Sequence, residues 1–279
     1  EVTGAEVYAT TVGNELTRRG HQVFYVSDTL TKPTLGPVFR LRFNKRSILR
    51  RFWHVFYLIY LIRKHRIQLV HAHSRASGWS SYVACKLTGT PMITTVHGRQ
   101  PVHASRKAFH ALGYRAVAVC EDIASQIIDN LGVDPAMVQV LRNGIETDKF
   151  QPVPIPDNDK PVIAIIGRLS GPKGELCYRL LDEVLDLEAC RVRVVSGTQV
   201  PARFARFQDK VDFVGYVDDV PALMAGCDLV IGAGRVAMEA LLCGRPAFAI
   251  GEARAIGLVT EQNLDEALAS NFGDIGPRD

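Results

Sequence analysis

Short apolar runs alternate along the chain with longer stretches whose apolar positions recur at helical spacing. Many of the runs are apolar throughout, as strands buried on both faces of a parallel sheet are. The runs are HQVFYV, VFRLRF, IQLVHAH, MITTVHG, RAVAVC and MVQVLRNG, followed by VIAIIG, VRVVSG, VDFVG, DLVIG and PAFAIG. Strands and helices that alternate in this way predict βαβ units and open parallel sheets.

A proline-rich stretch separates the two sets of runs. The sequence QPVPIPDNDKP contains four prolines in eleven residues, which is typical of a linker. We therefore predict an α/β fold with two Rossmann-like domains, residues 1–151 and 161–279, joined by a linker at 152–160. Asp157 and Asp159 have the spacing of a metal-binding pair, but they stand among linker prolines rather than at a strand end, so we interpret them as solvated.

The first residues predict a helix before any strand. The stretch EVTGAEVYATTVGNELTRRG enters a helical pattern at about Gly4 and leaves it near Gly20. A doubly wound domain usually opens with a strand that leads into a glycine turn. We therefore expect the first strand of the N-terminal domain to be missing from this sequence.

Composition restricts the function classes only weakly. The chain has 279 residues, 47% of them hydrophobic, and its formal charge of +4 is too small to indicate nucleic acid as a partner. Six cysteines at irregular spacings, with no C-x-x-C pair, argue against a zinc site and a disulfide framework. With no apolar run of about 18 residues and no signal-peptide pattern, we expect a cytoplasmic protein.

Residues 40–66 form a locally basic stretch. From residue 39 to 66 there are nine Arg or Lys residues and no acid, around an apolar and aromatic centre at 52–62. A basic helix with such a centre could lie on an anionic membrane surface, at the inner face of the membrane. The alternative is a helix that packs against the sheet and turns its cationic ends to water.

The stretch DLVIGAGRVAMEALLCGRPAFAIGE resembles a dinucleotide fingerprint. Its glycine turn begins at Gly232, and an acid, Glu252, follows 20 residues later. We rank an NAD dehydrogenase below the other functions, because the 48 residues from Gly232 onward are too few for a complete mononucleotide-binding half and its partner.

Seven motifs carry a resemblance to a known family. They are, in order, TGAEVYATTVGNELTRRGHQV, VHAHS, TTVHG, VLRNGIETDKFQP, IIGRLSGPKGE, VDFVGYVDDVPALMAGCDLVI and GRVAMEALLCGRP. Together they resemble the GT-B glycosyltransferases, most of all glycosyltransferase family 4, over nearly the whole chain. The resemblance implies two parallel sheets facing across a cleft and a nucleotide-sugar donor held mainly by the second domain. It also implies glycosyl transfer with retention and without a metal.

The candidate catalytic residues are Arg168, Lys173 and His97. Ligands of open parallel sheets bind beyond the carboxyl ends of the strands, where glycine turns lead into helices. Arg168 and Lys173 stand in such a turn, GRLSGPKGE, where two cations and backbone N–H groups could stabilise a diphosphate leaving group in place of Mg²⁺. The alternative is that they are solvated loop charges. The resemblance places His97 at the reacting sugar; otherwise it is structural.

The resemblance also implies the nucleotide contacts. Glu239 would accept hydrogen bonds from the ribose hydroxyls, and Gly234 would let the backbone approach the diphosphate. His71 and His73 share one face of VHAHS, but with no third ligand in register we predict no metal site. The remaining expected contacts to the nucleotide sugar are Gly4, Gly167, Gly197, Tyr216, Val217 and Arg235.

One departure from the family pattern leaves alternatives open. The family has a second glutamate eight positions before the ribose one, and here that position is Ile231. This loop looks closer to those of sugar-nucleotide epimerases and lipid-intermediate transferases that share the fold. We therefore keep three functions: a glycosyltransferase acting on a glycan or lipid-linked acceptor, an epimerase, and a nucleotide-sugar-binding protein without turnover. A nucleotide sugar, expected to be a UDP-sugar, is the substrate, and we expect no cofactor.

Overall fold

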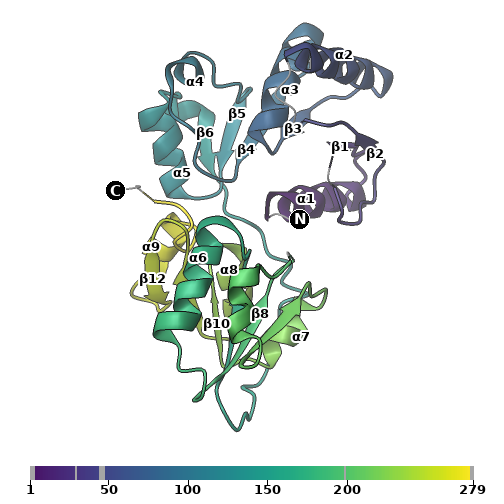
Figure 1. Cartoon of the computed structure of the whole chain (residues 1–279). Helices are drawn as coiled ribbons and strands as arrows, with labels where there is room; N and C mark the ends of the chain where they lie inside the picture. Colours follow the sequence, from purple (N-terminus) through teal and green to yellow (C-terminus); the bar gives the residue numbers. More distant parts are fainter. Residues whose placement is uncertain (1–3, 29, 44–47, 198, 277–279) are drawn as a thin grey trace. The chain divides into compact units, whose positions relative to one another are not determined.

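The computed structural model describes residues 4–28, 30–43, 48–197 and 199–276. The chain divides into two compact units, Val2–Asn143 and Gly144–Asp279 (Figure 1). The proline-rich residues 152–160 lie within the second unit. There the Arg245 guanidinium, which is buried, donates hydrogen bonds to the carbonyl oxygens of Val153 and Pro154.

The N-terminal unit contains two parallel sheets. Helix α1 (Gly4–Arg18) precedes strands β1 (Tyr25–Ser27) and β2 (Val38–Arg40), which pair with each other. The second sheet has the order β3-β4-β5-β6. Its strands are β3 (Val70–Ala72), β4 (Met92–Val96), β5 (Arg115–Ala118) and β6 (Val138–Val140). Within the described residues no strand pairing joins the two sheets.

Helices cover the four-stranded sheet. Helix α3 (Arg75–Thr88) begins at Ser74, whose side chain accepts a hydrogen bond from the Ser77 N–H, and ends at Gly89 in the left-handed conformation. Helix α2 (Ile48–Lys64) packs against α3. The remaining helical segments are α4 (Ala104–Ala108), α5 (Glu121–Ser125), a π-helical turn at Gln126–Asn130 and a 3₁₀ turn at Pro135–Met137.

Helix α2 confirms the helix expected in the basic stretch. One face is buried with α3 and β3, through Val55, Leu58 and Ile62. Residues 44–47 of the stretch lie outside the described residues. Among the helices that the structure describes, none combines the length and the apolar character needed to cross a bilayer.

The C-terminal unit is built on one six-stranded sheet of order β12-β11-β10-β7-β8-β9. All neighbours are parallel except β11 and β12. Numbered along the chain, this is the doubly wound order 3-2-1-4-5-6, with an antiparallel sixth strand. The strands are β7 (Val162–Ile166), β8 (Arg191–Val195), β9 (Val211–Gly215), β10 (Leu229–Gly232), β11 (Ala247–Ile250) and β12 (Ala255–Leu258).

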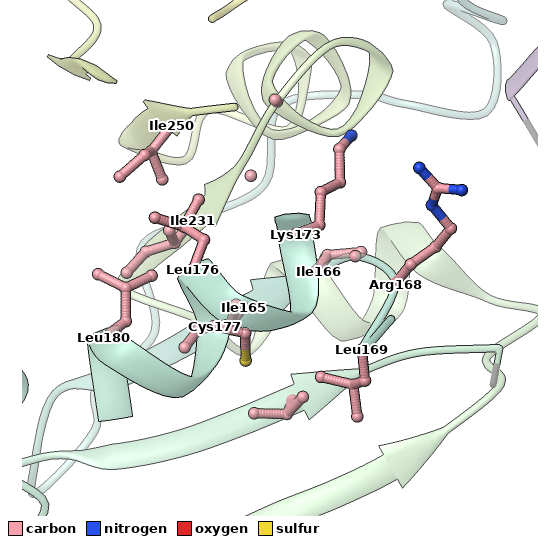
Figure 2. Close-up of a pocket in the computed structure, with 14 residues that line it drawn as sticks. Ile165, Ile166, Arg168, Leu169, Lys173, Leu176, Cys177, Leu180, Ile231 and Ile250 are labelled. Carbon is pink, nitrogen blue, oxygen red and sulfur yellow. The ribbon is translucent and has the colours of Figure 1, made fainter. Parts of the chain in front are cut away.

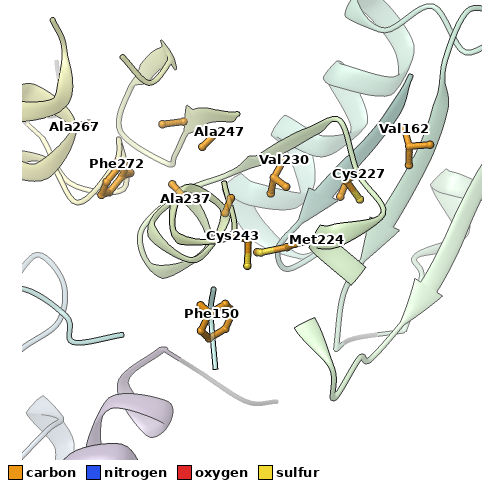
Figure 3. Close-up of a cluster of buried hydrophobic side chains, with 13 residues drawn as sticks. Phe150, Val162, Met224, Cys227, Val230, Ala237, Cys243, Ala247, Ala267 and Phe272 are labelled. Carbon is orange, nitrogen blue, oxygen red and sulfur yellow. The ribbon is translucent and has the colours of Figure 1, made fainter. Parts of the chain in front are cut away.

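Both faces of this sheet are covered by apolar clusters. Because successive strand residues point to opposite faces, Val230 packs into the cluster around α8 (Figure 3). The next residue, Ile231, packs into the cluster beneath α6. The helical segments are α6 (Gly171–Arg179), a π-helical turn at Leu180–Val184, a 3₁₀ helix at Ala202–Phe207, α7 (Val220–Ala225), α8 (Arg235–Leu242) and α9 (Leu264–Ala269).

The fold class predicted from the sequence is confirmed. Each of the eleven apolar runs contains a strand, and the sheets are parallel apart from one edge. Strand β12 was missed because its sequence, AIGL, is short and contains a glycine, as edge strands can. All six cysteines are free thiols, and five of them are buried.

Candidate functional site

The carboxyl ends of β7 and β10 form the centre of the candidate site. These strands are neighbours in the sheet, although α6, β8, β9 and α7 separate them along the chain. The connections from β7 and β10 lead to opposite sides of this point, which is where doubly wound sheets bind their ligands. Gly167 and Arg168 follow β7, and Gly232 ends β10. The structure thus brings together two of the turns expected from the sequence.

The turn after β7 leads directly into α6. Gly171 has a φ of 63° and begins the helix, so Lys173 lies in its first turn. A side chain at Gly174 would collide with the carbonyl group of Leu169, so the glycine lets the helix pack against its own entry turn. The N–H groups at this helix start are unpaired by the helix itself and carry partial positive charge, which favours an anion.

Arg168 and Lys173 extend from this turn, away from the apolar side chains beneath it (Figure 2). Each has a carboxylate partner in the described structure. Arg168 lies 3.0 Å from Glu252 and Lys173 lies 2.8 Å from Asp274. The Lys173 pair is the more buried, with side chains 25% and 19% exposed. A diphosphate binding to both cations would therefore have to share or displace two carboxylates.

A small cavity of about 30 Å³ lies below the two cations. Apolar side chains of β7, α6, β10 and β11 line it, among them Ile231, which is only 4% exposed (Figure 2). The position where the family has an acid is therefore part of the apolar core in this chain. Its side chain contributes no polar group to the site.

Gly234 directly precedes α8 and has a backbone conformation that is unusual for other residues. Its φ of 58° and ψ of −129° lie in a region that is open essentially to glycine alone. Its N–H donates to the Asn271 carbonyl oxygen at 3.1 Å. A side chain at Gly234 would come within 3.1 Å of the Asn271 amide and 3.4 Å of Asp274 Oδ2. The segment after α9 therefore lies directly over this turn.

Asp274 is the residue of this site that the sequence reasoning missed. Asn271, Phe272 and Gly273 all have positive φ values, of 50°, 55° and 87°. The backbone of Gly273 packs so closely on Gly251 that a Cβ at Gly251 would collide with it. The other carboxylate oxygen of Asp274, Oδ1, is buried and has no hydrogen-bond partner among the described residues. This irregular turn places the Asp274 carboxylate beside Lys173, and no sequence motif predicts the turn.

Arg235 and Glu239 form a buried ion pair on α8. Arg235 Nη2 lies 3.1 Å from Glu239 Oε1, and both side chains are 12% exposed. Arg235 Nη1 also donates to the Gly144 carbonyl oxygen at 2.8 Å. Burial raises the pKa of Glu239 above its usual range, and the Arg235 charge offsets part of that rise. The carboxylate is thus held in place by a neighbour that sequence spacing, i and i+4, could have suggested.

Three further expected residues follow β8 and β9. Gly197 follows β8, and a Cβ there would lie 3.6 Å from the Tyr216 ring. Tyr216 is 51% exposed, and Val217 beside it is half-buried. Asp159, expected to be solvated, forms an exposed ion pair with Arg191 at 2.8 Å.

The N-terminal unit contains a separate cluster of three histidines and Tyr8. His71 lies in β3, His73 directly follows β3, and His97 directly follows β4. His73 Nδ1 lies 3.3 Å from His97 Nε2, and His71 Nε2 lies 2.7 Å from the Thr95 hydroxyl. The Tyr8 ring packs edge-on against His97, with the ring centres 5.0 Å apart.

These histidines are neutral in the folded protein. Burial lowers the pKa of His71 to about 4. Burial, together with the neighbouring histidine rings, lowers the pKa of His97 to about 4 and that of His73 to about 2. Although the structure brings the third histidine to the pair, no group of three or more His, Cys, Asp or Glu in the described parts of the chain could hold a metal ion. Gly4, at the start of α1, is exposed in this same unit.

Comparison with known proteins places this geometry in context. The sequence profile of Glycosyltransferase Family 4 matches residues 2–149, more than half of the chain. A UDP-Gal:alpha-D-GlcNAc-diphosphoundecaprenol alpha-1,3-galactosyltransferase of Escherichia coli is 24% identical over 250 residues, which cover 77% of this chain and 63% of that protein. The chain spans between 34% and 63% of the length of the first curated relatives that it matches.

Solved structures show the same fold. A glycosyltransferase from Rickettsia africae ESF-5 aligns with a TM-score of 0.72 and 21% identity, over 96% of this chain and 84% of its own. Anabaena HepE in complex with UDP-glucose aligns with a TM-score of 0.70 and 18% identity, over 98% of this chain and 90% of its own. The fold is therefore GT-B.

Proposed function

The chain belongs to glycosyltransferase family 4, and on that premise we propose that it transfers a sugar from a nucleotide-sugar donor to an acceptor. The observation that carries the proposal is the pair of cations, Arg168 and Lys173, that one turn supplies at the point where the sheet order reverses. We infer that the donor diphosphate binds there, above the start of α6.

The cations act on the leaving group. When the bond between the sugar and the diphosphate breaks, negative charge develops on the phosphate oxygens. Arg168 can donate two parallel hydrogen bonds to an oxyanion, and Lys173 contributes a point charge. Both cations already lie about 3 Å from a carboxylate, so in this proposal the diphosphate shares or displaces Glu252 and Asp274 when it binds. We propose that these two residues replace a metal ion in a retaining transfer.

Other residues hold the nucleotide-sugar donor in this proposal. Glu239 accepts hydrogen bonds from the ribose. Gly234 would let the diphosphate approach the start of α8 once the segment with Asn271 and Asp274, which lies over this turn, moves aside. Gly167, Gly197, Tyr216, Val217 and Arg235 complete the donor contacts of the C-terminal unit. Gly4 is proposed as a further contact to the nucleotide sugar, and His97 as a residue that acts at the reacting sugar. The neutral state of His97 suits a hydrogen-bonding role at a sugar hydroxyl.

The relatives support a UDP-sugar as the donor class. The name of the Escherichia coli relative gives UDP-galactose as donor and a lipid diphosphate-linked GlcNAc as acceptor. The Anabaena structure contains UDP-glucose. We propose a UDP-sugar donor and a glycan or lipid-linked acceptor for this chain as well.

Nucleotide release from a panel of UDP-, GDP- and ADP-sugars tests the proposal. Release should fall by at least about a hundredfold in Arg168→Ala and in Lys173→Ala, because each removes a charge contact made in the transition state. Arg179→Ala is the matched control, since Arg179 lies on the same helix in an exposed pair with Glu183 and should leave release unchanged. Conversion of the donor sugar without release would instead establish an epimerase, and binding without either reaction a nucleotide-sugar-binding protein.

A further inference from the structure

Helix α2 presents a stripe of aromatic side chains to solvent. Phe52, Trp53, Phe56 and Tyr60, which we call the aromatic stripe, are 53%, 64%, 66% and 51% exposed. At about 100° per residue these four positions fall within one sector of the helix surface. Large exposed side chains are common singly, but a contiguous apolar patch on one helix face marks a contact site.

Cations border the aromatic stripe. Arg63 and Lys64 close its C-terminal end and line a shallow hollow together with Phe56, Ile59 and Tyr60. The Lys64 ammonium lies 5.2 Å from the centre of the Tyr60 ring. At the other end of the helix, Arg51 is exposed and lies 5.7 Å from the Trp79 ring. The exposed face of α2 is thus aromatic along its length and cationic at its C-terminal end, while Arg51 adds a positive charge beside the start of the helix.

The charge of the whole N-terminal half agrees with this local pattern. Residues 1–143 contain 19 Lys or Arg and 8 Asp or Glu, a formal +11, whereas residues 144–279 contain 14 and 21, a formal −7. No Asp or Glu occurs between Asp28 and Glu121. The small net charge of the chain therefore conceals a strongly cationic half that carries the aromatic stripe.

We propose that α2 docks this unit on an anionic lipid bilayer, lying along the membrane surface with the aromatic stripe inserted at the level of the headgroups. Trp, Tyr and Phe next to Lys and Arg are the side chains that favour this depth. The opposite face of α2 is packed in the protein core, so the helix can insert one side without unfolding. The 17-residue helix with its cationic ends does not span the bilayer. Membrane docking does not depend on whether the chain catalyses the proposed glycosyl transfer.

Sedimentation of the full chain with vesicles tests the proposal. We expect binding to vesicles of phosphatidylcholine mixed with phosphatidylglycerol, and at least about tenfold weaker binding to phosphatidylcholine alone or at high salt. Trp53→Ala with Phe56→Ala, and separately Arg63→Gln with Lys64→Gln, should each weaken binding to the mixed vesicles about tenfold or more.

Tyr114→Ala is the matched control. Tyr114 is 66% exposed, as Phe56 is, but it lies directly before β5 and not on α2. Its loss should change vesicle binding by less than about twofold. A variant with Trp79→Phe retains Trp53 as its one tryptophan, and its emission should shift to the blue on the mixed vesicles and resist acrylamide quenching.

Three outcomes would overturn the proposal. The first is equal binding to neutral and anionic vesicles, and the second is unchanged Trp53 emission on the mixed vesicles. The third is a self-associated protein that does not bind vesicles and becomes monomeric when the aromatic stripe is removed, because a second copy of the chain would then cover this face. Circular dichroism of each variant controls for folding.

Discussion

Acidification should destabilise the N-terminal unit through its three buried histidines. In the folded unit burial lowers the pKa of His71, His73 and His97 to about 4, about 2 and about 4. In the unfolded chain a histidine has a pKa of about 6.5. As the pH falls below that value, the unfolded chain binds protons that the folded unit does not, so folding stability falls.

The magnitude follows from the two pKa values. For a histidine with a pKa of about 4 folded and about 6.5 unfolded, lowering the pH from about 6.5 to about 5 removes about 1.6 kcal/mol of unfolding free energy. His73, with a folded pKa of about 2, loses about the same amount over this range, because its folded form also stays neutral. The three together remove about 5 kcal/mol, which is comparable with the whole stability of many domains.

Tryptophan fluorescence during urea unfolding measures this loss, because both tryptophans, Trp53 and Trp79, belong to the N-terminal unit. His71→Gln should reduce the pH-dependent loss by about 1.6 kcal/mol, since a glutamine amide can keep the hydrogen bond to the Thr95 hydroxyl but does not titrate. His21→Asn, at an exposed position, is the control. A wild-type stability that changes by less than about 1 kcal/mol over this pH range would refute the reasoning.

The C-terminal unit gives two further predictions. Asp274→Asn should strengthen UDP binding about fivefold without affecting uridine, because it frees Lys173 from a competing carboxylate; weaker UDP binding in calorimetry would contradict this prediction. The second prediction concerns Glu239: Glu239→Gln should weaken uridine binding about tenfold. Because burial raises the folded pKa of Glu239, wild-type stability should fall as the pH rises from the unfolded pKa to the folded one. A pH profile of stability that stays the same in Glu239→Gln would contradict this.

The sequence predicted the fold more completely than the site. Apolar runs of five residues identify buried strands because burial on both faces demands apolar side chains throughout. The turn with Arg168 and Lys173 was recognisable because its glycines and cations are adjacent in sequence. The carboxylates that pair with these cations are 84 and 101 residues away, and no local pattern can indicate such contacts.

The histidine cluster also depends on a contact between residues that are distant in sequence. His71 and His73 were recognisable as neighbours on one strand, but their approach to His97 depends on the pairing of β3 with β4. For the basic stretch, the sequence left two alternatives, a helix on a membrane surface and a helix packed against the sheet with its cationic ends in water. Only the structure shows that the aromatic residues, rather than the aliphatic ones, point outward.

Ile231 stands where the family has an acid, and the packing around it makes an acid at this position unfavourable. Ile231→Glu should lower the unfolding free energy by at least about 3 kcal/mol, because it buries a carboxylate in an apolar cluster while Lys173 already pairs with Asp274. Ile231→Val, the size control, should cost only about 1 kcal/mol. Hydrogen exchange of β10 measures both, since this unit contains no tryptophan. The prediction would be contradicted if Ile231→Glu were as stable as Ile231→Val and also changed the selectivity among donor sugars. If the cost is as large as expected, an acid at the end of this strand is incompatible with the packing beneath α6. The structure already has another carboxylate at this site, because Asp274 in the turn after α9 would lie 3.4 Å from a Cβ at Gly234.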